Sequence, residues 1–178
     1  MGWNYTRLNQ DYRSIHALCR FLLEQSTPLV EVGPIASQPF LLNMARLYEL
    51  FVSEWLRAHL PAPWRLKVQE AVTVGQNNDL RFELDLVLYD GHGRVTAVLD
   101  TKYKTPSHTA MTDVNQVVTY AQAKGAAQAV LIYPVVLARP LDVQLQQLRV
   151  RTLTFAVTDD LAQAGQHFLA QLLPNADK

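Results

Sequence analysis

The chain has 178 residues, 49% of them hydrophobic, which is enough to bury the core of one globular domain. Its 16 basic and 16 acidic residues give a formal net charge of zero. This excludes an overall basic surface, so any nucleic-acid contact must come from a local patch or from a partner. Cys19 is the single cysteine, which excludes an internal disulfide and a cysteine-based zinc cluster and favours an intracellular, cytoplasmic setting.

The sequence lacks the patterns of export, membrane insertion and nucleotide binding. The amino terminus has no apolar segment of signal-peptide type, and no apolar run approaches the roughly 18 residues that a membrane span needs. The chain has no P-loop and no GxGxxG motif, and its five histidines are scattered without metal-ligand spacing. We therefore expect a soluble protein that does not itself bind a nucleotide.

The first third of the chain is predicted to be helical. Apolar residues recur at helical spacing between Asp11 and Gln25, which predicts a first helix. A longer amphipathic pattern over residues 44–61 predicts the main core helix. We expect a single domain over residues 1–178, with a helical amino-terminal part of about 1–62 and a sheet core of about 63–178.

The rest of the chain predicts a mixed sheet flanked by helices. Segments rich in β-branched, aromatic and leucine residues predict strands at Arg65–Val74, Leu80–Tyr89, Val95–Lys104, Ala129–Val136 and Arg149–Val157. The predicted helices are Met111–Lys124, which Gly125 ends, and Asp159–Leu173, which Asp159 or Thr158 caps. A strand, a crossover helix and a wholly apolar strand imply a parallel pairing, so the fold class is α/β.

Two aspartates are predicted to face each other in this sheet. The turn Asp90-Gly91-His92-Gly93 joins two strands as an antiparallel hairpin. If the loop covers residues 91–94, residues whose numbers sum to 185 are opposed, so Asp85 lies opposite Asp100. Opposed positions have Cβ atoms roughly 4.5 to 5.5 Å apart and share a face with every second residue along the strand. Lys102 therefore joins the two carboxylates.

Two carboxylates this close repel each other unless a positive group lies beside them. A divalent cation fits, because magnesium takes one or two protein carboxylates together with waters and phosphate oxygens. A bound metal would lower the pKa of a water, and Lys102 could orient that water or stabilise negative charge on a phosphate.

The alternative is that the Asp100-x-Lys102 pattern is a solvated salt bridge, which is its commonest meaning. Against this, both charges interrupt a strand that is apolar on both faces, where charges are costly unless they are paired or functional. The helix that follows carries Asp113, Gln116 and Tyr120 on one face, which could lie over the carboxylates. Gln116 is then a phosphate-contacting or supporting group, or else simply part of a solvated helix edge.

Segments along nearly the whole chain resemble a known family. They are Tyr12-Arg13, Met44–Val52 (MARLYELFV), Asp100–Lys104 (DTKYK), the helix with Asn115-Gln116, and Val130–Pro134 (VLIYP). In this order they resemble the PD-(D/E)XK nuclease superfamily and, within it, the nuclease domain of McrC, a component of 5-methylcytosine-specific McrBC restriction systems.

The resemblance implies a restriction-endonuclease-like fold and a Mg²⁺-dependent endodeoxyribonuclease, with Mn²⁺ as a substitute. It assigns catalysis to Asp85, Asp100 and Lys102, with Gln116 and Glu49 as further site residues, and assigns the metal to Asp85, Asp100 and Glu49. From this chain alone, Glu49 could equally pair with Arg46 or Arg57. The acid motif reads Leu84-Asp85 where Pro-Asp is usual, a change that a strand tolerates.

The resemblance also implies DNA and a McrB-like AAA+ GTPase as partners, and dimerisation would serve double-strand cleavage. McrC proteins of this kind carry an additional amino-terminal region that engages the GTPase, whereas this chain begins almost directly at the nuclease part. Three explanations fit this difference: the chain is an excised domain, it is a shortened homologue, or its docking segment lies on another protein. Two other functions remain open, a non-catalytic nucleic-acid-binding or assembly subunit of the same fold and a repair or recombination nuclease.

Overall fold

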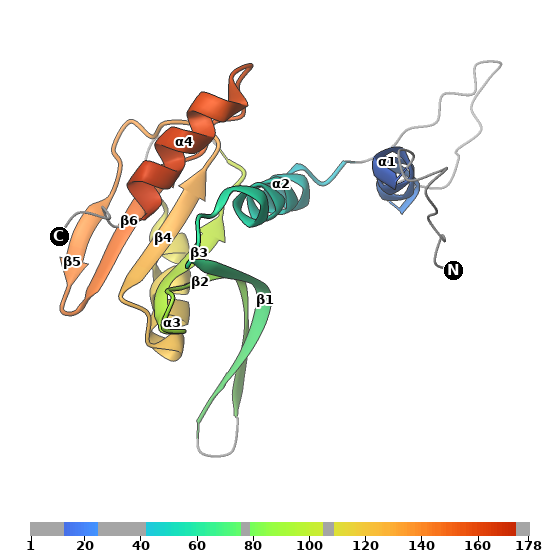
Figure 1. Ribbon diagram of the computed structural model, residues 1–178. Helices are drawn as coiled ribbons and strands as arrows, with labels where there is room; N and C mark the ends of the chain where they lie inside the picture. Colours follow the sequence, from blue (N-terminus) through green and yellow to red (C-terminus); the bar gives the residue numbers. More distant parts are fainter. Residues whose placement is uncertain (1–12, 25–41, 76–78, 105–108, 174–178) are drawn as a thin grey trace, which may run out of the picture. The chain divides into compact units, whose positions relative to one another are not determined.

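A computed structural model describes residues 13–24, 42–75, 79–104 and 109–173 (Figure 1). The chain divides into two compact units, Met1–Met44 and Ala45–Lys178, and each is described by itself. In the first unit, helix α1 (Arg13–Glu24) confirms the first predicted helix, whose expected ends at residues 11 and 25 lie outside the described residues. The expectation of one domain over the whole chain stays a prediction. None of the described helices is long and apolar enough to span a membrane.

The second unit is a six-stranded sheet with helices on both faces. The helices are α2 (Met44–His59), α3 (Met111–Lys124) and α4 (Leu161–Leu172). The strands are β1 (Arg65–Val74), β2 (Leu80–Tyr89), β3 (Val95–Thr101), β4 (Gln128–Tyr133), β5 (Asp142–Leu145) and β6 (Leu148–Thr154). This arrangement confirms the predicted α/β class with a mixed sheet flanked by helices, and it is consistent with a restriction-endonuclease-like fold.

The strand order across the sheet is β1-β2-β3-β4-β6-β5. β1, β2 and β3 form an antiparallel meander, and β3, β4 and β6 run parallel to one another. α3 connects β3 to β4, which is the crossover that the sequence predicted. β3 and β4 therefore lie in the middle of the sheet, where apolar residues cover both of their faces.

Two hydrophobic clusters hold the helices to the sheet. On one face, α2 and α4 pack against the strands through residues such as Leu56 and Phe168, which are fully buried or nearly so. On the other face, Val117 of α3 packs in a separate cluster with Val98 of β3. Figure 1 shows α4 in front of the sheet and α3 behind it. The end of β3 is thus enclosed between helices on both sides.

Local sequence explains where α3 and α4 begin and end. Gly125 has a φ of 68°, the left-handed conformation that glycine adopts at low cost, and its N–H bonds the carbonyls of Ala121 and Gln122. This confirms the predicted end of α3. The predicted cap of α4 was wrong, because the carboxylate of Asp160, rather than Asp159 or Thr158, accepts the backbone N–H of Gln163.

Three strands are shorter than predicted at their carboxyl ends. β3 ends at Thr101, β4 at Tyr133 and β6 at Thr154. β4 stops before Pro134, which lacks the N–H needed to continue the ladder. β5 was not predicted, because it has only four residues, all exposed, and an alternation this short is a weak signal. It pairs with β6 along one edge of the sheet.

Candidate functional site

The register of β2 and β3 brings Asp85 and Asp100 together. Leu86 pairs with Leu99 and Val87 with Val98, so residue numbers sum to 185 as predicted, but only beyond a bulge at Leu88/Tyr89 that the prediction of a regular hairpin did not include. The next position in this register is Asp85 opposite Asp100. The backbone N–H of Thr101, beside Asp100, donates to the carboxylate of Asp85. The two acids therefore lie at the point where the pairing of β2 with β3 ends.

β1 and β2 are both irregular at this point. Leu84 packs in the cluster on the α3 side and Leu86 in the cluster on the α2 side, although alternate residues of a regular strand share a face. On β1, Gln69 has a φ of 52°, a left-handed conformation that is unusual for a residue other than glycine. β2 therefore changes face at Asp85, and local irregularities of this kind are common beside functional sites.

The environment of Asp85 disfavours its charge. Burial, followed by the negative charges of Asp100 and Glu49, raises the pKa of Asp85 from 3.8 to about 6, and the nearby Lys102 opposes the rise. A carboxylate held in this way gains from any cation that binds beside it. A residue whose pKa is perturbed by burial and by specific charges is a candidate for function.

Asp100 is 2% exposed, and its Oδ2 lies 2.7 Å from the ammonium of Lys102. This contact is an ion pair without hydrogen-bond geometry, since Oδ2 has no hydrogen-bond partner within the described part of the chain. Burial raises the pKa of Asp100, and Lys102 lowers it in turn. The solvated salt bridge considered from the sequence does not describe this pair, because both side chains are largely withdrawn from water.

α3 contributes Gln116 to the same site. The Nζ of Lys102 donates to Gln116 Oε1 at 3.1 Å, and Gln116 Nε2 donates to the hydroxyl of Tyr120 at 3.0 Å. The polar face of α3 therefore lies over the end of β3, as the sequence suggested it could. Lys102 is held between the carboxylate of Asp100 and the amide of Gln116, which fixes where its positive charge lies.

Glu49 reaches this region from α2. Its charge raises the pKa of Asp85, so it lies near that acid, and Arg46 forms an ion pair with its Oε1 at 2.7 Å. The side-chain amide of Gln69 lies 3.4 Å from the same oxygen. Of the two pairings considered for Glu49, the structure shows the one with Arg46, because Arg57 instead pairs with Glu54.

The donor set suits magnesium better than a metal that needs a full protein cage. Across the described residues, no three His, Cys, Asp or Glu side chains are gathered closely enough to hold a metal by themselves. Magnesium needs only one or two carboxylates, because waters and phosphate oxygens complete its octahedron. Asp85 and Asp100 supply such a pair, and the buried Oδ2 of Asp100 lacks a hydrogen-bond partner among the described residues.

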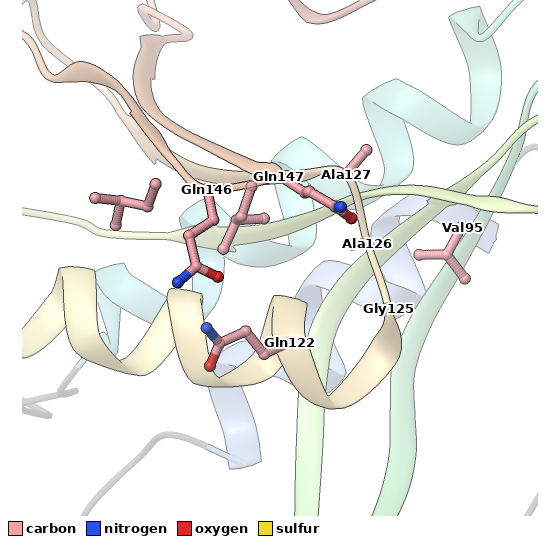
Figure 2. A pocket seen from close by; sticks show the side chains of 9 residues that line it. Val95, Gln122, Gly125, Ala126, Ala127, Gln146 and Gln147 are labelled. Carbon is pink, nitrogen blue, oxygen red and sulfur yellow. The ribbon is translucent and has the colours of Figure 1, made fainter.

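A pocket of about 320 Å³ lies elsewhere, where α3 ends and β5 turns into β6. Figure 2 shows the amides of Gln122 and Gln146 approaching the same space from these two elements. Its lining contains no charged side chain and none of the proposed site residues. The pocket therefore offers no ionisable group for catalysis or for a metal, and the acids at the end of β3 are the better candidate site.

Some neighbours of the site were not predicted as site residues. Lys104 forms an ion pair with Asp113 of α3 at 2.5 Å, and Tyr133 is fully buried at the end of β4. Gln69 was also missed. A signal for the first pair exists in the sequence, because Lys104 follows Lys102 by two residues and Asp113 precedes Gln116 by three, so that each shares a face with its neighbour.

A comparison with family models finds a match over most of the chain. The model of a family described as McrBC 5-methylcytosine restriction system component matches residues 1–134. The match includes α2, the strands β1 to β4 and α3, and hence every residue assigned to the site. A comparison with curated proteins finds no match. Because the family match covers more than half of its residues, the chain belongs to the family of McrBC 5-methylcytosine restriction system components.

Proposed function

We propose that this restriction-system component is a DNA endonuclease that hydrolyses the phosphodiester backbone with Mg²⁺ at Asp85 and Asp100. The observation that carries the proposal is the pairing of these two acids beside Lys102. Support also comes from the raised pKa of both carboxylates. Their negative charges are disfavoured in the fold, so a bound cation would stabilise them. The superfamily name PD-(D/E)XK describes this same set of two acids and a lysine.

In this proposal, Asp85 and Asp100 hold the cation, and Glu49 lies close enough to influence its surroundings. Mg²⁺, or Mn²⁺ in its place, would activate a water and neutralise charge on the phosphate. Lys102 stabilises negative charge on the phosphate or orients the attacking water, because Asp100 and Gln116 fix its ammonium. Gln116 acts as the group that orients Lys102 and as a contact for a phosphate oxygen.

The proposed partners are DNA and a McrB-like AAA+ GTPase. The chain has no P-loop, so nucleotide hydrolysis would come from that second protein. A formal net charge of zero gives the chain little general attraction to DNA, which suits a subunit that depends on a partner for delivery to its target. Cleavage of both strands would require two such sites, and hence two copies of the chain.

A second candidate is an assembly or nucleic-acid-binding subunit that keeps the fold without catalysis. The neutral charge favours it to the same degree that it favours partner-dependent cleavage. The two differ at the acids, because a subunit without catalysis has no need for a buried Asp100 beside Lys102. Cleavage assays on site variants separate the two.

The test is plasmid cleavage with Mg²⁺ or Mn²⁺, run with and without a McrB-type GTPase and GTP. We expect the wild type to cut and both Asp100→Ala and Lys102→Ala to lose cleavage by at least about 100-fold, with circular dichroism unchanged. Asp142→Asn is the matched control, because it removes an exposed acid of the β5–β6 hairpin that is also ion-paired. Cleavage that survives both site changes would refute the assignment, and activity lost equally in the control would point to misfolding.

A further inference from the structure

Buried polar atoms without a hydrogen-bond partner are concentrated beside Asp100. Six such side-chain atoms occur in the described residues, and four of them are Asp100 Oδ2, Thr109 Oγ1, Asp113 Oδ2 and Tyr133 OH. Asp100 pairs with Leu131, two residues before Tyr133, so both side chains lie on the α3 face of the sheet. Two of the four, Oδ2 of Asp100 and Oδ2 of Asp113, are in ion pairs with the ammonium groups of Lys102 and Lys104.

These groups influence one another electrically. Burial, followed by the negative charges of Asp113 and Asp100, raises the pKa of the Tyr133 hydroxyl to about 12. The charge of Asp113 also raises the pKa of Asp100, and that of Lys104 lowers it. Asp113 and Lys104 thus lie close enough to Asp100 to belong to its electrostatic environment.

Two cross-links join the end of β3 to the start of α3. One is the bond from Lys102 to Gln116, and the other is the ion pair of Lys104 with Asp113, 2.5 Å from Nζ to Oδ2. Lys102 and Lys104 are two residues apart, and Asp113 and Gln116 lie one helical turn apart on one face of α3. The two links therefore run side by side between the same two elements.

The two links differ in the burial of the residue that α3 contributes. Gln116 is exposed, whereas Asp113 is 7% exposed and lies in the first turn of α3, where the helix dipole favours an acid. The Lys104–Asp113 ion pair is only partly buried, because Lys104 is 43% exposed, so we expect it to add little net stability. The ion pair with Lys104 links the first turn of α3 to the segment after β3, and Gln116 lies one turn further along the same helix.

We propose that Asp113 is a positioning residue of the site, which acts through Lys104 to hold α3 so that Gln116 stays on the ammonium of Lys102. This inference rests on the proposed function, because Lys102 matters only if the site is used. Asp113 touches neither metal nor substrate in this account. It acts as supporting residues around metal sites do, where a substitution costs about 10- to 100-fold in affinity or activity.

The test compares Asp113→Asn with the exposed-pair control Asp142→Asn by three measurements. The first is the ¹⁵N–¹H signals of the lysine ammonium groups in selectively labelled protein, assigned with Lys102→Met and Lys104→Met. The second is Mg²⁺ affinity by calorimetry, and the third is cleavage. For Asp113→Asn we expect a shifted Lys102 signal, Mg²⁺ affinity within about threefold of wild type and cleavage lowered about 10- to 100-fold. Asp142→Asn should change none of them.

Lys104→Gln provides an independent route to the same link, because the Lys104 side chain is 43% exposed and can be changed without opening the core. It should reproduce the loss in cleavage, and the double variant should be no worse than either single one. An unmoved Lys102 signal in both variants would overturn the proposal, as would additive losses. A wild type that neither binds Mg²⁺ nor cuts DNA refutes the proposed function instead, and the lysine signals then still decide whether Asp113 positions Lys102.

Discussion

The ammonium of Lys102 lies 2.7 Å from Oδ2 of Asp100, two positions back along the same segment, and both side chains are largely buried. Their mutual attraction therefore acts in a medium that screens it poorly. The structure contains a useful contrast in Arg149 and Asp142, whose ion pair of 2.6 Å is about half exposed on both sides. The two pairs have similar lengths and very different surroundings.

This contrast predicts different costs for removing the two cations. Lys102→Ala leaves Asp100 buried without compensation and should lower the free energy of unfolding by about 2 kcal/mol, somewhat less than for a fully buried pair. Arg149→Ala should cost at most about 1 kcal/mol, because water solvates Asp142 in its place. Urea denaturation of both variants measures the difference. Equal small losses would show that Lys102 is not a buried partner.

The raised pKa of Asp85 predicts how stability depends on pH. Its pKa is raised from 3.8 to about 6, so the folded protein holds this proton more tightly than the unfolded chain does. In the metal-free protein, this proton contributes fully to the stability of the folded state below pH 3.8. The contribution is lost as the pH rises through 6. At pH 7.5, Asp85→Asn should be more stable than the wild type by on the order of 2 kcal/mol.

Thermal unfolding in a chelator, measured from pH 4 to 8, checks this prediction. The advantage of Asp85→Asn should shrink towards pH 4, where the folded wild type holds the proton and the unfolded chain approaches its own pKa of 3.8. Excess Mg²⁺ should reverse the order at pH 7.5, because the wild type alone keeps both proposed ligands. A variant that is less stable than the wild type throughout this range would show that the charge of Asp85 is not disfavoured in the fold.

The packing of α4 on α2 predicts a sensitive glycine. A Cβ added at Gly165 would lie 1.9 Å from Cζ2 of Trp55, so the ring would have to move. Gly165→Ala should destabilise the protein by about 1 to 3 kcal/mol, although alanine is the better helix former by about 1 kcal/mol. Gln166→Ala, at the exposed neighbouring position, should be nearly neutral. Thermal unfolding of the two variants decides, and a stabilised Gly165→Ala would contradict the packing described here.

Local sequence patterns predicted the elements that position the site. The bounds of β1, β2 and α3 were predicted as observed, because apolar periodicity and Gly125 mark them within short stretches of chain. The predicted hairpin placed Asp85 opposite Asp100, although the observed turn pairs Tyr89 with Val95 and a bulge at Leu88/Tyr89 brings the register to the predicted one. The face change at Asp85 and the left-handed Gln69 could not be predicted, since a regular strand was assumed there.

Tertiary packing decided the rest of the site. Whether Glu49 meets Arg46 or Arg57 depends on the rotation of α2 against the sheet, which no local pattern encodes. The Lys104–Asp113 ion pair likewise depends on how α3 returns to the end of β3. The spacing of residues predicts which of them share a face of a helix or strand. It does not predict which residue of another element they contact.

The central claim is that Asp85 and Asp100 bind a divalent cation, and a calorimetric titration of Mn²⁺ or Mg²⁺ into the purified chain tests it most directly. The titration needs neither the partner nor the right DNA. We expect saturable binding to the wild type and to Asp142→Asn, and its loss in Asp100→Asn, which keeps the size of the side chain but removes its charge. Equal binding to the wild type and to Asp100→Asn would contradict the account.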